Sequence, residues 1–281
     1  MKYNTPAAFR QAIDARLTRQ ASEEGIDRVR LQRRLAFERF LARLFHSNLE
    51  RWVLKGGYAL ELRLGGRARA TKDLDFNAPP GSAEELLEEL RDASEINLGD
   101  FFRFSVLQSP RGELFGPPEG GQRFRVEARL DTNRVYATFL IDVGQGDVLI
   151  NPIDKIPARV NLEFAELLTP PFPSYPLPEH FAEKFHAYTR PRSERTRVKD
   201  LLDLTLIIED LELIPNPALA RVIEMVFERY QSHSLPTPDQ VEPPPETWRE
   251  PYRVMAQELG LSVTDVFEAF GRFQRFLIRC W

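Results

Sequence analysis

Two aspartates, Asp73 and Asp75, stand one residue apart in the segment TKDLDF. Side chains at positions i and i+2 of a strand lie on one face, so Leu74 is expected to point the other way, into the core. Two carboxylates held side by side repel each other. A divalent cation such as Mg²⁺, or Mn²⁺, relieves that repulsion because it binds carboxylate and phosphate oxygens together. The alternative is a pair of solvated acids at a strand end, which explains most isolated Asp-x-Asp sequences.

A glycine turn precedes these acids. The segment VLKGGYALEL predicts a strand and then a helix, with Gly56 and Gly57 at the turn, where the backbone can approach a ligand closely. The N-terminus of that helix is a favourable place for a phosphate. Nearby cations would add to this, namely Lys55, Arg67, Arg69 and Lys72. The alternative is a plain strand–turn–helix corner followed by a solvated basic loop.

A third carboxylate is expected if two metal ions are to be held. Asp142, in TFLIDVG, is our candidate because it is the acid that lies inside an apolar strand, with Phe139 and Ile141 before it. A buried lone carboxylate is costly unless it is paired or bound to a metal. We expect its strand to lie beside the strand of Asp73. The alternative places Asp142 at a strand end, facing water.

A second charged cluster lies in the segment AEKFHAYTRPRSERTRVKDLLDL. Asp200 and Asp203 are three residues apart on one predicted helix and are therefore neighbours on its surface. Asp203 lies in a core-like run and needs a cationic partner, for which Lys184 on the preceding helix is the natural candidate. This pair is either a structural bridge or part of a triphosphate site, and both roles are compatible. The basic loop between the helices favours a contact with nucleotide or RNA phosphates; it contains Arg190, Arg192, Arg195, Arg197 and Lys199.

The elements that must position these residues follow from hydrophobic periodicity. Predicted helices of the first half cover residues 4–19, 25–45, 59–64 and 82–95, the last with a Ser82/Glu85 capping box. Predicted strands cover residues 52–54, 74–76, 101–108, 124–130 and 136–144, with a hairpin loop at 131–134. Helices then follow at about 178–189, 197–212, 216–231, 247–258 and 262–279. We therefore predict an α/β core with N-terminal helices over 1–150, a proline-rich linker over 151–178 and a helical domain over 179–281.

The composition excludes several classes of protein. The 281 residues include one cysteine, Cys280, which rules out a disulfide framework and a cysteine-rich zinc site and points to the cytoplasm. No apolar run is long enough to cross a membrane, and the N-terminus is not a secretory signal. The net charge is -4, but residues 1–47 hold ten Lys/Arg against five Asp/Glu. That local excess is either a solvated helix face or a phosphate contact surface. The four histidines have no metal-ligand spacing.

The stretch LKGGYAL…RATKDLDF resembles the minimal nucleotidyltransferase fold of the polymerase-beta superfamily. More narrowly, it is similar to the AbiEii/AbiGii (MenT-like) nucleotidyltransferase toxins. Their pattern of Lys-Gly-Gly-x-Ala-Leu, a basic loop and Ser/Thr-x-Asp-Leu-Asp-Phe is met from Lys55 to Phe76. Tyr58 stands where the superfamily has serine, so Thr71 is the candidate for a hydroxyl near the phosphates. The later Ala-x-Lys and Arg-x-x-Asp-Leu-x-Asp-Leu motifs match at Lys184, Asp200 and Asp203. The specific motifs cover residues 50–76 and 177–207.

The resemblance implies an α+β fold, in which a mixed sheet with helices is followed by a mainly helical C-terminal domain. It implies a Mg²⁺- or Mn²⁺-dependent nucleotidyltransferase that uses an NTP. The implied catalytic residues are Asp73, Asp75, Lys184 and Asp203. The implied nucleotide-binding residues are Lys55, Gly56, Gly57, Arg67, Thr71, Lys184 and Asp200. The implied metal ligands are Asp73 and Asp75, and Asp142 completes the expected metal ligands as the candidate third carboxylate.

The resemblance also implies a biological role. The acceptor would be RNA, above all the 3′ end of tRNA, and its modification would block aminoacylation and growth. The protein would be the toxin of a type IV-like toxin–antitoxin or phage-defence system, with a cognate antitoxin and no membrane partner. Three alternatives stay open: a non-catalytic RNA- or partner-binding protein of the same fold, transfer to a protein or small-molecule hydroxyl, and a sugar transferase. The last would need a longer nucleotide-binding domain before the Asp-x-Asp motif than about 70 residues can form.

Overall fold

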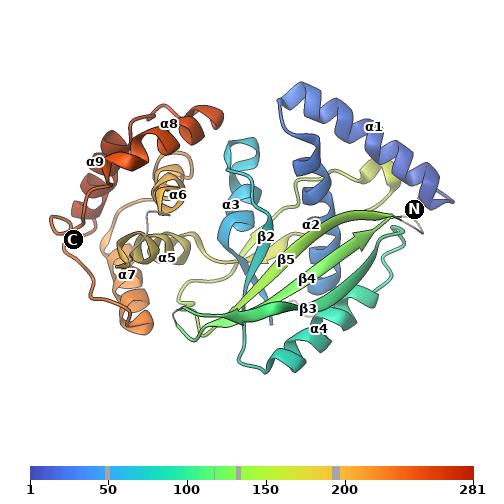
Figure 1. Ribbon diagram of the computed structural model, residues 1–281, viewed down its shortest axis with the longest axis horizontal. Coiled ribbons are helices and arrows are strands. Elements are labelled where there is room, and N and C mark those ends of the chain that lie inside the picture. Colours follow the sequence, from blue (N-terminus) through green and yellow to red (C-terminus); the bar gives the residue numbers. More distant parts are fainter. Residues whose placement is uncertain (48–50, 117, 131–133, 192–196) are drawn as a thin grey trace. The chain divides into compact units, whose positions relative to one another are not determined.

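The structure is a computed structural model that describes residues 1–47, 51–116, 118–130, 134–191 and 197–281. The chain divides into two compact units, which are interleaved in sequence (Figure 1). The first unit comprises residues 1–62, 70–146 and 155–174, and the second comprises residues 63–69, 147–154 and 175–281. Each unit is described by itself.

A mixed sheet of seven strands forms the frame of the first unit, in the order β3-β4-β5-β2-β1-β7-β6. Its strands are β1 (Val53–Lys55), β2 (Asp73–Ala78), β3 (Arg103–Leu114), β4 (Gly121–Arg129), β5 (Val135–Gln145), β6 (Asp154–Ile156) and β7 (Phe172–Ser174). Strands β3, β4 and β5 are antiparallel neighbours, whereas β2 is parallel to β5 and antiparallel to β1. The expectation that the strands of Asp73 and Asp142 are neighbours is confirmed.

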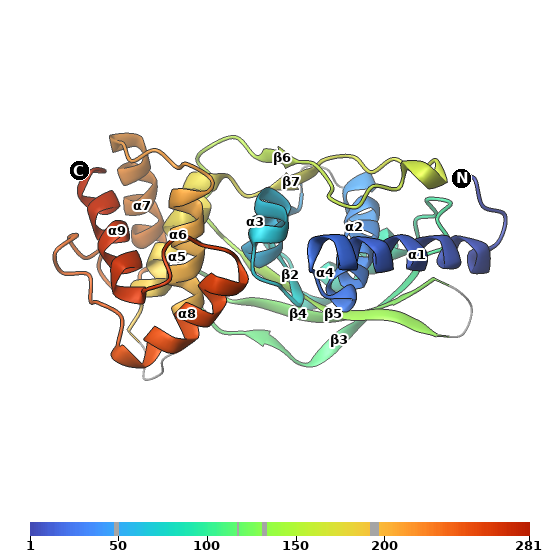
Figure 2. The same cartoon turned by 90° about the horizontal axis from the view of Figure 1, so that it is seen from above.

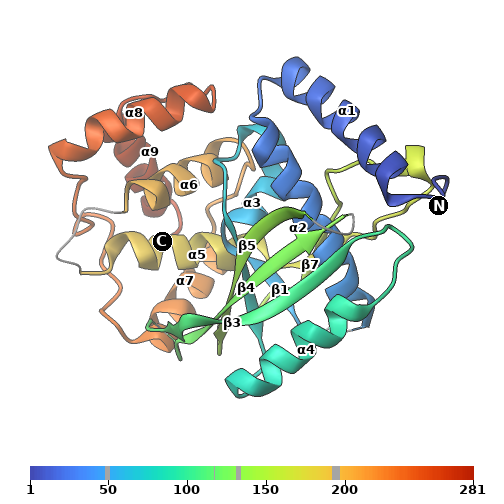
Figure 3. The same ribbon diagram turned by 45° about the vertical axis from the view of Figure 1, so that its right-hand side comes forward.

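Helices cover one face of this sheet. The helices that begin in the first half of the chain are α1 (Pro6–Glu24), α2 (Arg28–Ser47), α3 (Gly56–Leu64) and α4 (Ala83–Glu95). Helices α2 and α4 pack on the same side of strands β3 to β5, and α1 packs on α2 (Figures 2 and 3). Residues of β5 alternate accordingly: Phe139, Ile141 and Val143 are buried, and Leu140 and Asp142 point to the opposite face. The opposite face is therefore where charged side chains of β2, β4 and β5 gather.

Helix ends follow the local sequence signals. The Ser82 hydroxyl accepts a hydrogen bond from the backbone N–H of Glu85, and the Glu85 carboxylate accepts one from the N–H of Ser82, which confirms the predicted capping box of α4. Helix α1 begins after Thr5, as predicted, but continues to Glu24. It ends there because Gly25 adopts a left-handed conformation with φ of 66°.

The basic excess of residues 1–47 has a third explanation that the sequence did not suggest. Arg39 and Arg43 on α2 are both buried, and both form ion pairs with the buried Asp100, with contacts of 2.6 and 2.5 Å. Arg34 is also buried and lies 2.9 Å from Glu61. For these three arginines both sequence interpretations were wrong, because their charges are neutralised inside the unit and reach neither water nor a phosphate.

The proline-rich segment 151–178 contributes to the sheet. It contains β6, a 3₁₀ turn at Glu163–Ala165, and β7, whose Ser174 pairs with Leu54 of β1 in parallel register. Strands β4 and β5 are antiparallel, as the predicted hairpin requires, although residues 131–133 of its loop lie outside the described residues.

The second unit is mainly helical. Its helices are α5 (Leu177–Thr189), α6 (Val198–Glu209), α7 (Pro217–Tyr230), α8 (Arg249–Glu258) and α9 (Val266–Ile278). Aromatic rings fill its core: the Phe185 ring lies 5.3 Å from the rings of both Phe227 and Phe273. The predicted α+β class, with a mainly helical C-terminal part, is confirmed. Within the described ranges, no helix is long and apolar enough to cross a membrane.

Candidate active site

Four charged residues of the first unit form one row across its sheet. Lys55 of β1 is the register partner of Asp75 on β2, Asp75 is the partner of Asp142 on β5, and Asp142 is the partner of Arg123 on β4. Register partners lie on the same face, and neighbouring strands are about 4.8 Å apart. The row therefore reads cation, carboxylate, carboxylate, cation. Asp73 lies two residues before Asp75 on the same face, and the intervening Leu74 is fully buried, as predicted.

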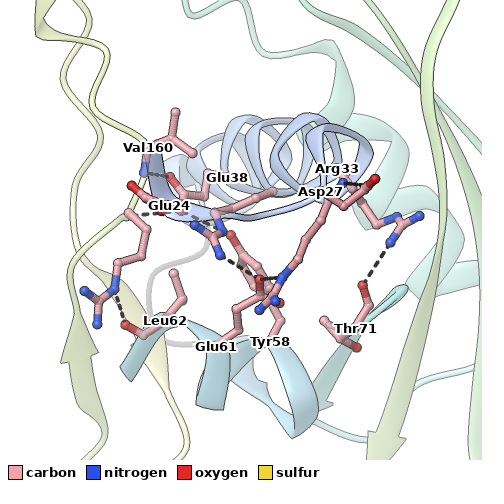
Figure 4. A network of polar contacts seen from close by, with 12 residues as sticks. Glu24, Asp27, Arg33, Glu38, Tyr58, Glu61, Leu62, Thr71 and Val160 are labelled. Carbon is pink, nitrogen blue, oxygen red and sulfur yellow. Dashed lines mark hydrogen bonds and ion pairs between the residues drawn. The ribbon is translucent and has the colours of Figure 1, made fainter. Parts of the chain in front are cut away.

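The orientation of Asp73 is fixed by Thr71. The Thr71 hydroxyl donates a hydrogen bond of 2.7 Å to the Oδ1 atom of Asp73. The carbonyl of Thr71 accepts a hydrogen bond of 3.2 Å from the guanidinium of Arg33 on α2, a contact drawn in Figure 4. The hydroxyl that we expected to face a phosphate is therefore directed at the carboxylate, with α2 behind it.

The glycine turn lies directly against Asp75. Gly56 has a φ of +64°, and a Cβ atom at this position would lie 2.0 Å from the Oδ2 atom of Asp75. Only glycine satisfies both conditions, because other residues would suffer backbone strain as well as a clash. The close approach that the sequence predicted is therefore observed, and its partner within the first unit is a carboxylate. Helix α3 begins at Gly56 itself, so its first N–H groups start beside this acid.

Tyr58, at the position where the superfamily has serine, points into the core. Its hydroxyl donates a hydrogen bond of 3.1 Å to Glu38 of α2 (Figure 4). Glu38 also accepts hydrogen bonds of 2.8 Å from the backbone N–H groups of Arg159 and Val160. Burial raises the pKa of Glu38, and these hydrogen bonds oppose that effect. Tyr58 therefore ties α3 to α2 and has a structural role.

Glu61, one turn further along α3, strengthens the same connection. Its Oε1 atom lies 2.9 Å from both Arg30 and Arg34 of α2. Two buried contacts between α2 and α3 thus hold the helix that begins at the glycine turn (Figure 4). A fixed α3 in turn fixes the position of Gly56 against Asp75.

Asp142 is held by an arginine that sequence reasoning missed. Arg123 donates two hydrogen bonds to its carboxylate, at 2.7 Å from Nε and 2.5 Å from Nη2. The hydrogen bond with Asp142 raises the pKa of Arg123, and the charges of Asp73 and Asp75 add to this. A predicted strand starting at Phe124 leaves Arg123 out, whereas β4 begins at Gly121. Extending the alternation of that strand by one residue would have placed Arg123 on the charged face.

This set of donors suits a divalent cation in part. Asp73 and Asp75 present carboxylates on one face, and Asp142 is the register partner of Asp75 on that face. Carboxylate oxygens are the ligands that Mg²⁺ prefers. Among the described residues, however, no three His, Cys, Asp or Glu side chains are gathered closely enough to form a complete metal site. The two hydrogen bonds from Arg123 occupy the carboxylate of Asp142.

The second unit contains the other predicted cluster. The Nζ atom of Lys184 lies 2.8 Å from Asp203 and 3.4 Å from Asp200, which confirms the expected partner of Asp203. Arg69 also binds both oxygens of Asp203, each at 3.0 Å. Arg197 lies 2.8 Å from Asp200. These two carboxylates thus hold three cations together.

The charges in this cluster stabilise one another. Burial by itself would lower the pKa of Lys184, but Asp203 and Asp200 outweigh it, and the pKa is raised. Burial would raise the pKa of Asp203, but Lys184 and Arg69 outweigh it, and the pKa is lowered. Lys184 is therefore a cation at neutral pH, and Asp203 is ionised.

The remaining basic residues differ in their surroundings. Arg67 forms an ion pair of 2.9 Å with Asp210 and is half-exposed. Arg190 directly follows α5, but Lys199 lies in the first turn of α6, so its assignment to the basic loop was wrong. Arg192 and Arg195 lie outside the described residues.

The glycine turn against Asp75, the Asp-x-Asp strand and the parallel strand of Asp142 are the features that the sequence associated with nucleotidyltransferases. The comparisons with known proteins give the same class. Residues 39–277 match the family model described as nucleotidyl transferase AbiEii toxin, type IV toxin–antitoxin system, and the chain belongs to this family. The predicted family is confirmed, and with it the general activity of a nucleotidyltransferase toxin.

The comparison with solved structures gives one match above a TM-score of 0.5 and a weaker one, among those reported. MenT4, a nucleotidyltransferase toxin from Mycobacterium tuberculosis H37Rv, matches with a TM-score of 0.59 and 20% identity over 95% of this chain and 98% of that one. JHP933 from Helicobacter pylori matches with a TM-score of 0.47 and 16% identity, over 88% of this chain and 91% of that one. A search of curated proteins found no match.

Proposed function

We propose that the protein transfers a nucleoside monophosphate from an NTP to a hydroxyl of RNA, with the 3′ end of tRNA as the acceptor. The hydroxyl oxygen forms a bond to the α-phosphorus and loses its proton, and the bond between that phosphorus and the bridging oxygen to the β-phosphate breaks, releasing pyrophosphate. Family membership supplies the reaction class. We assign the reaction to particular residues because Asp73, Asp75 and Asp142 lie on one face of the sheet and Gly56 lies against Asp75.

Asp73, Asp75 and Asp142 are the residues that would hold Mg²⁺ or Mn²⁺. When bound, such ions lower the pKa of an attacking hydroxyl and neutralise a triphosphate. The protein contributes orientation: Thr71 fixes one carboxylate through its 2.7 Å hydrogen bond, and Gly56 leaves room for the other. The first N–H groups of α3 and the side chain of Lys55 supply positive charge to phosphates on this face.

We propose that Lys184 is a cation that contacts the triphosphate. Its ion pairs with Asp203 and Asp200 hold it in position. Its raised pKa keeps the charge at neutral pH. Asp203 is 1% exposed and its two oxygens contact Arg69 and Lys184, so we propose that it positions these cations and does not touch substrate. Arg67, which is half-exposed, is proposed to contact the nucleotide.

An RNA acceptor is supported by charge on the open face of the sheet. Arg103 of β3 and Arg129 of β4 are register partners, both exposed, on the face that carries the carboxylates. Phosphate contacts by such arginines position a nucleic acid without reading its sequence. A tRNA with a modified 3′ end cannot receive an amino acid, so we propose that the protein acts in the cytoplasm and arrests growth. We further propose that a cognate antitoxin relieves this arrest and that the pair serves in phage defence.

Label transfer tests this proposal. Purified protein is incubated with Mg²⁺, total tRNA and each labelled NTP in turn, beside Asp73→Ala and the exposed-site control Asp92→Ala. Label in the RNA that disappears with Asp73→Ala and persists with Asp92→Ala would support the reaction and identify the nucleotide. Label in a protein or small molecule would instead change the acceptor. No label in any of these, together with retained RNA binding, would contradict the enzyme and favour a binding protein.

A further inference from the structure

The ion pair between Arg123 and Asp142 occupies one of the three carboxylates that the proposed function gives to a divalent cation. Both contacts are short, and both use the planar edge of the guanidinium, which is the strongest geometry available to an arginine and a carboxylate. Arg123 also experiences the charges of Asp73 and Asp75. Arg123 therefore compensates part of the charge of this group of acids, at the end of the row opposite Lys55.

The two partners differ in how easily they can separate. The side chain of Asp142 is 15% exposed and lies in the middle of a strand, whereas that of Arg123 is 33% exposed. Arg123 is attached to β4, between β3 and β5, and its side chain is the more exposed of the two. A dication placed among the acids would repel the guanidinium at this short range. Arg123 can then move into solvent while the carboxylate stays in place.

We propose that Arg123 is an internal counter-ion that holds Asp142 when no divalent cation is bound and releases it when one binds. Arg123 is then a positioning residue: it prevents repulsion among three acids in the empty site, and it competes with the cation for the third carboxylate. This inference rests on the proposed function, since it requires a cation at Asp73 and Asp75. It assigns a role to a residue outside the motifs that define the family resemblance.

A double-mutant cycle on metal affinity tests the exchange. The dissociation constant of Mn²⁺ is measured by titration of the full-length protein without NTP or RNA, for the wild type, Arg123→Ala, Asp142→Asn and the double variant. We expect Arg123→Ala to bind Mn²⁺ about tenfold more tightly, because the substitution removes the ion pair that competes for Asp142. About tenfold is the lower end of the change in metal affinity produced by groups around a metal ligand, whose loss weakens binding when they support the ligand. The same substitution in the Asp142→Asn background should change the affinity by less than about twofold.

A matched control separates competition from general electrostatics. Arg125 lies two residues along β4 on the same face, is exposed, and pairs with Glu127 at 3.0 Å. Arg125→Ala removes the same charge from the same face and should leave the Mn²⁺ affinity within about twofold of the wild type. Thermal unfolding checks that Arg123→Ala folds. Arg123→Gln, which removes the charge but keeps a donor, serves as a second variant with the same expected direction.

Each outcome decides the inference. Unchanged or weaker Mn²⁺ binding by both Arg123 variants would overturn it, and so would equal tightening with and without Asp142. If the wild type shows no Mn²⁺ binding that Asp73→Ala removes, the proposed metal site fails as well. If that binding is present and the cycle shows no coupling, only the counter-ion role fails.

Discussion

At the scale of single residues, Gly56 has the strictest requirement in the proposed site. It combines a positive φ with contact against Asp75, and either condition alone is enough to favour glycine. Gly25 provides a natural comparison, because its φ of +66° is similar but nothing lies within 4 Å of the position of a Cβ atom. A substitution at Gly25 therefore tests backbone strain alone, whereas a substitution at Gly56 also tests the position of the Asp75 carboxylate.

We predict that Gly25→Ala costs about 1–2 kcal/mol of unfolding free energy, the usual cost of a left-handed residue with a side chain. Gly56→Ala should cost more and should also displace Asp75, so that nucleotide transfer is lost. Denaturant unfolding and the label-transfer assay measure the two effects separately. Gly56→Ala with full transfer activity would contradict the role given to this turn.

The sequence predicted the acids better than the cations. Asp73 and Asp75 share a face because strands have a period of two, and this rule needs no knowledge of the fold. Arg123 and Tyr58 were different, because their roles depend on partners that are distant in sequence, Asp142 and Glu38. Arg39 and Arg43 of α2 were missed for the same reason: their partner, Asp100, is about 60 residues away.

At the scale of elements, helices α5 and α6 are joined by Lys184, Asp200 and Asp203. Asp203 is 1% exposed and lies 2.8 Å from Lys184, whereas Asp200 is 9% exposed and lies 3.4 Å from it. The lowered pKa of Asp203 means that its contribution to stability is present above the unfolded pKa and is lost as pH falls through the folded value. The pair should therefore be intact throughout the neutral range.

We predict that Asp203→Asn costs about 3 kcal/mol at pH 7, because it leaves Lys184 and Arg69 with one fewer buried counter-charge. Asp200→Asn should cost about 1–2 kcal/mol, since its contact with Lys184 is longer. Urea unfolding followed by circular dichroism measures both. Equal losses of unfolding free energy for the two variants would contradict this prediction and would show that Asp200 and Asp203 stabilise Lys184 equally.

A buried histidine between α5 and the end of α7 should make the stability of the protein depend on pH. Burial lowers the pKa of His186 on α5 to about 3, and its ring contacts Ser232, just after α7, at 2.8 Å. Below about pH 6.5 the imidazole of His186 binds a proton in the unfolded chain but not in the folded one. The free energy of unfolding therefore falls as pH decreases. We expect a loss of about 2 kcal/mol between pH 7 and pH 5. His186→Gln should reduce this slope, and the exposed His46→Gln should leave it unchanged. A slope that is unaffected by His186→Gln would refute this origin.

At the scale of the whole molecule, the elements were predictable and their assembly was not. Hydrophobic periodicity and caps predicted most of the long helices and main strands to within four residues, whereas α1 and β3 continue five and six residues beyond their predicted ends. The strand order placed β7 beside β1, and periodicity has no information on such pairing between segments about 120 residues apart. Residues 63–69, which include Arg69, also belong to the second unit, although they are close in sequence to the Asp-x-Asp strand of the first.

The central claim is that this chain adds a nucleotide to the end of RNA, and the intact mass of tRNA tests it most directly. Total or transcribed tRNA is incubated with Mg²⁺, NTPs and either the wild type or Asp75→Asn, and is then weighed by mass spectrometry. We predict a gain of one or more nucleoside monophosphates at the 3′ end with the wild type and an unchanged mass with the variant. An unchanged tRNA mass with active, folded wild-type protein, under conditions in which pyrophosphate is still released, would contradict RNA as the acceptor.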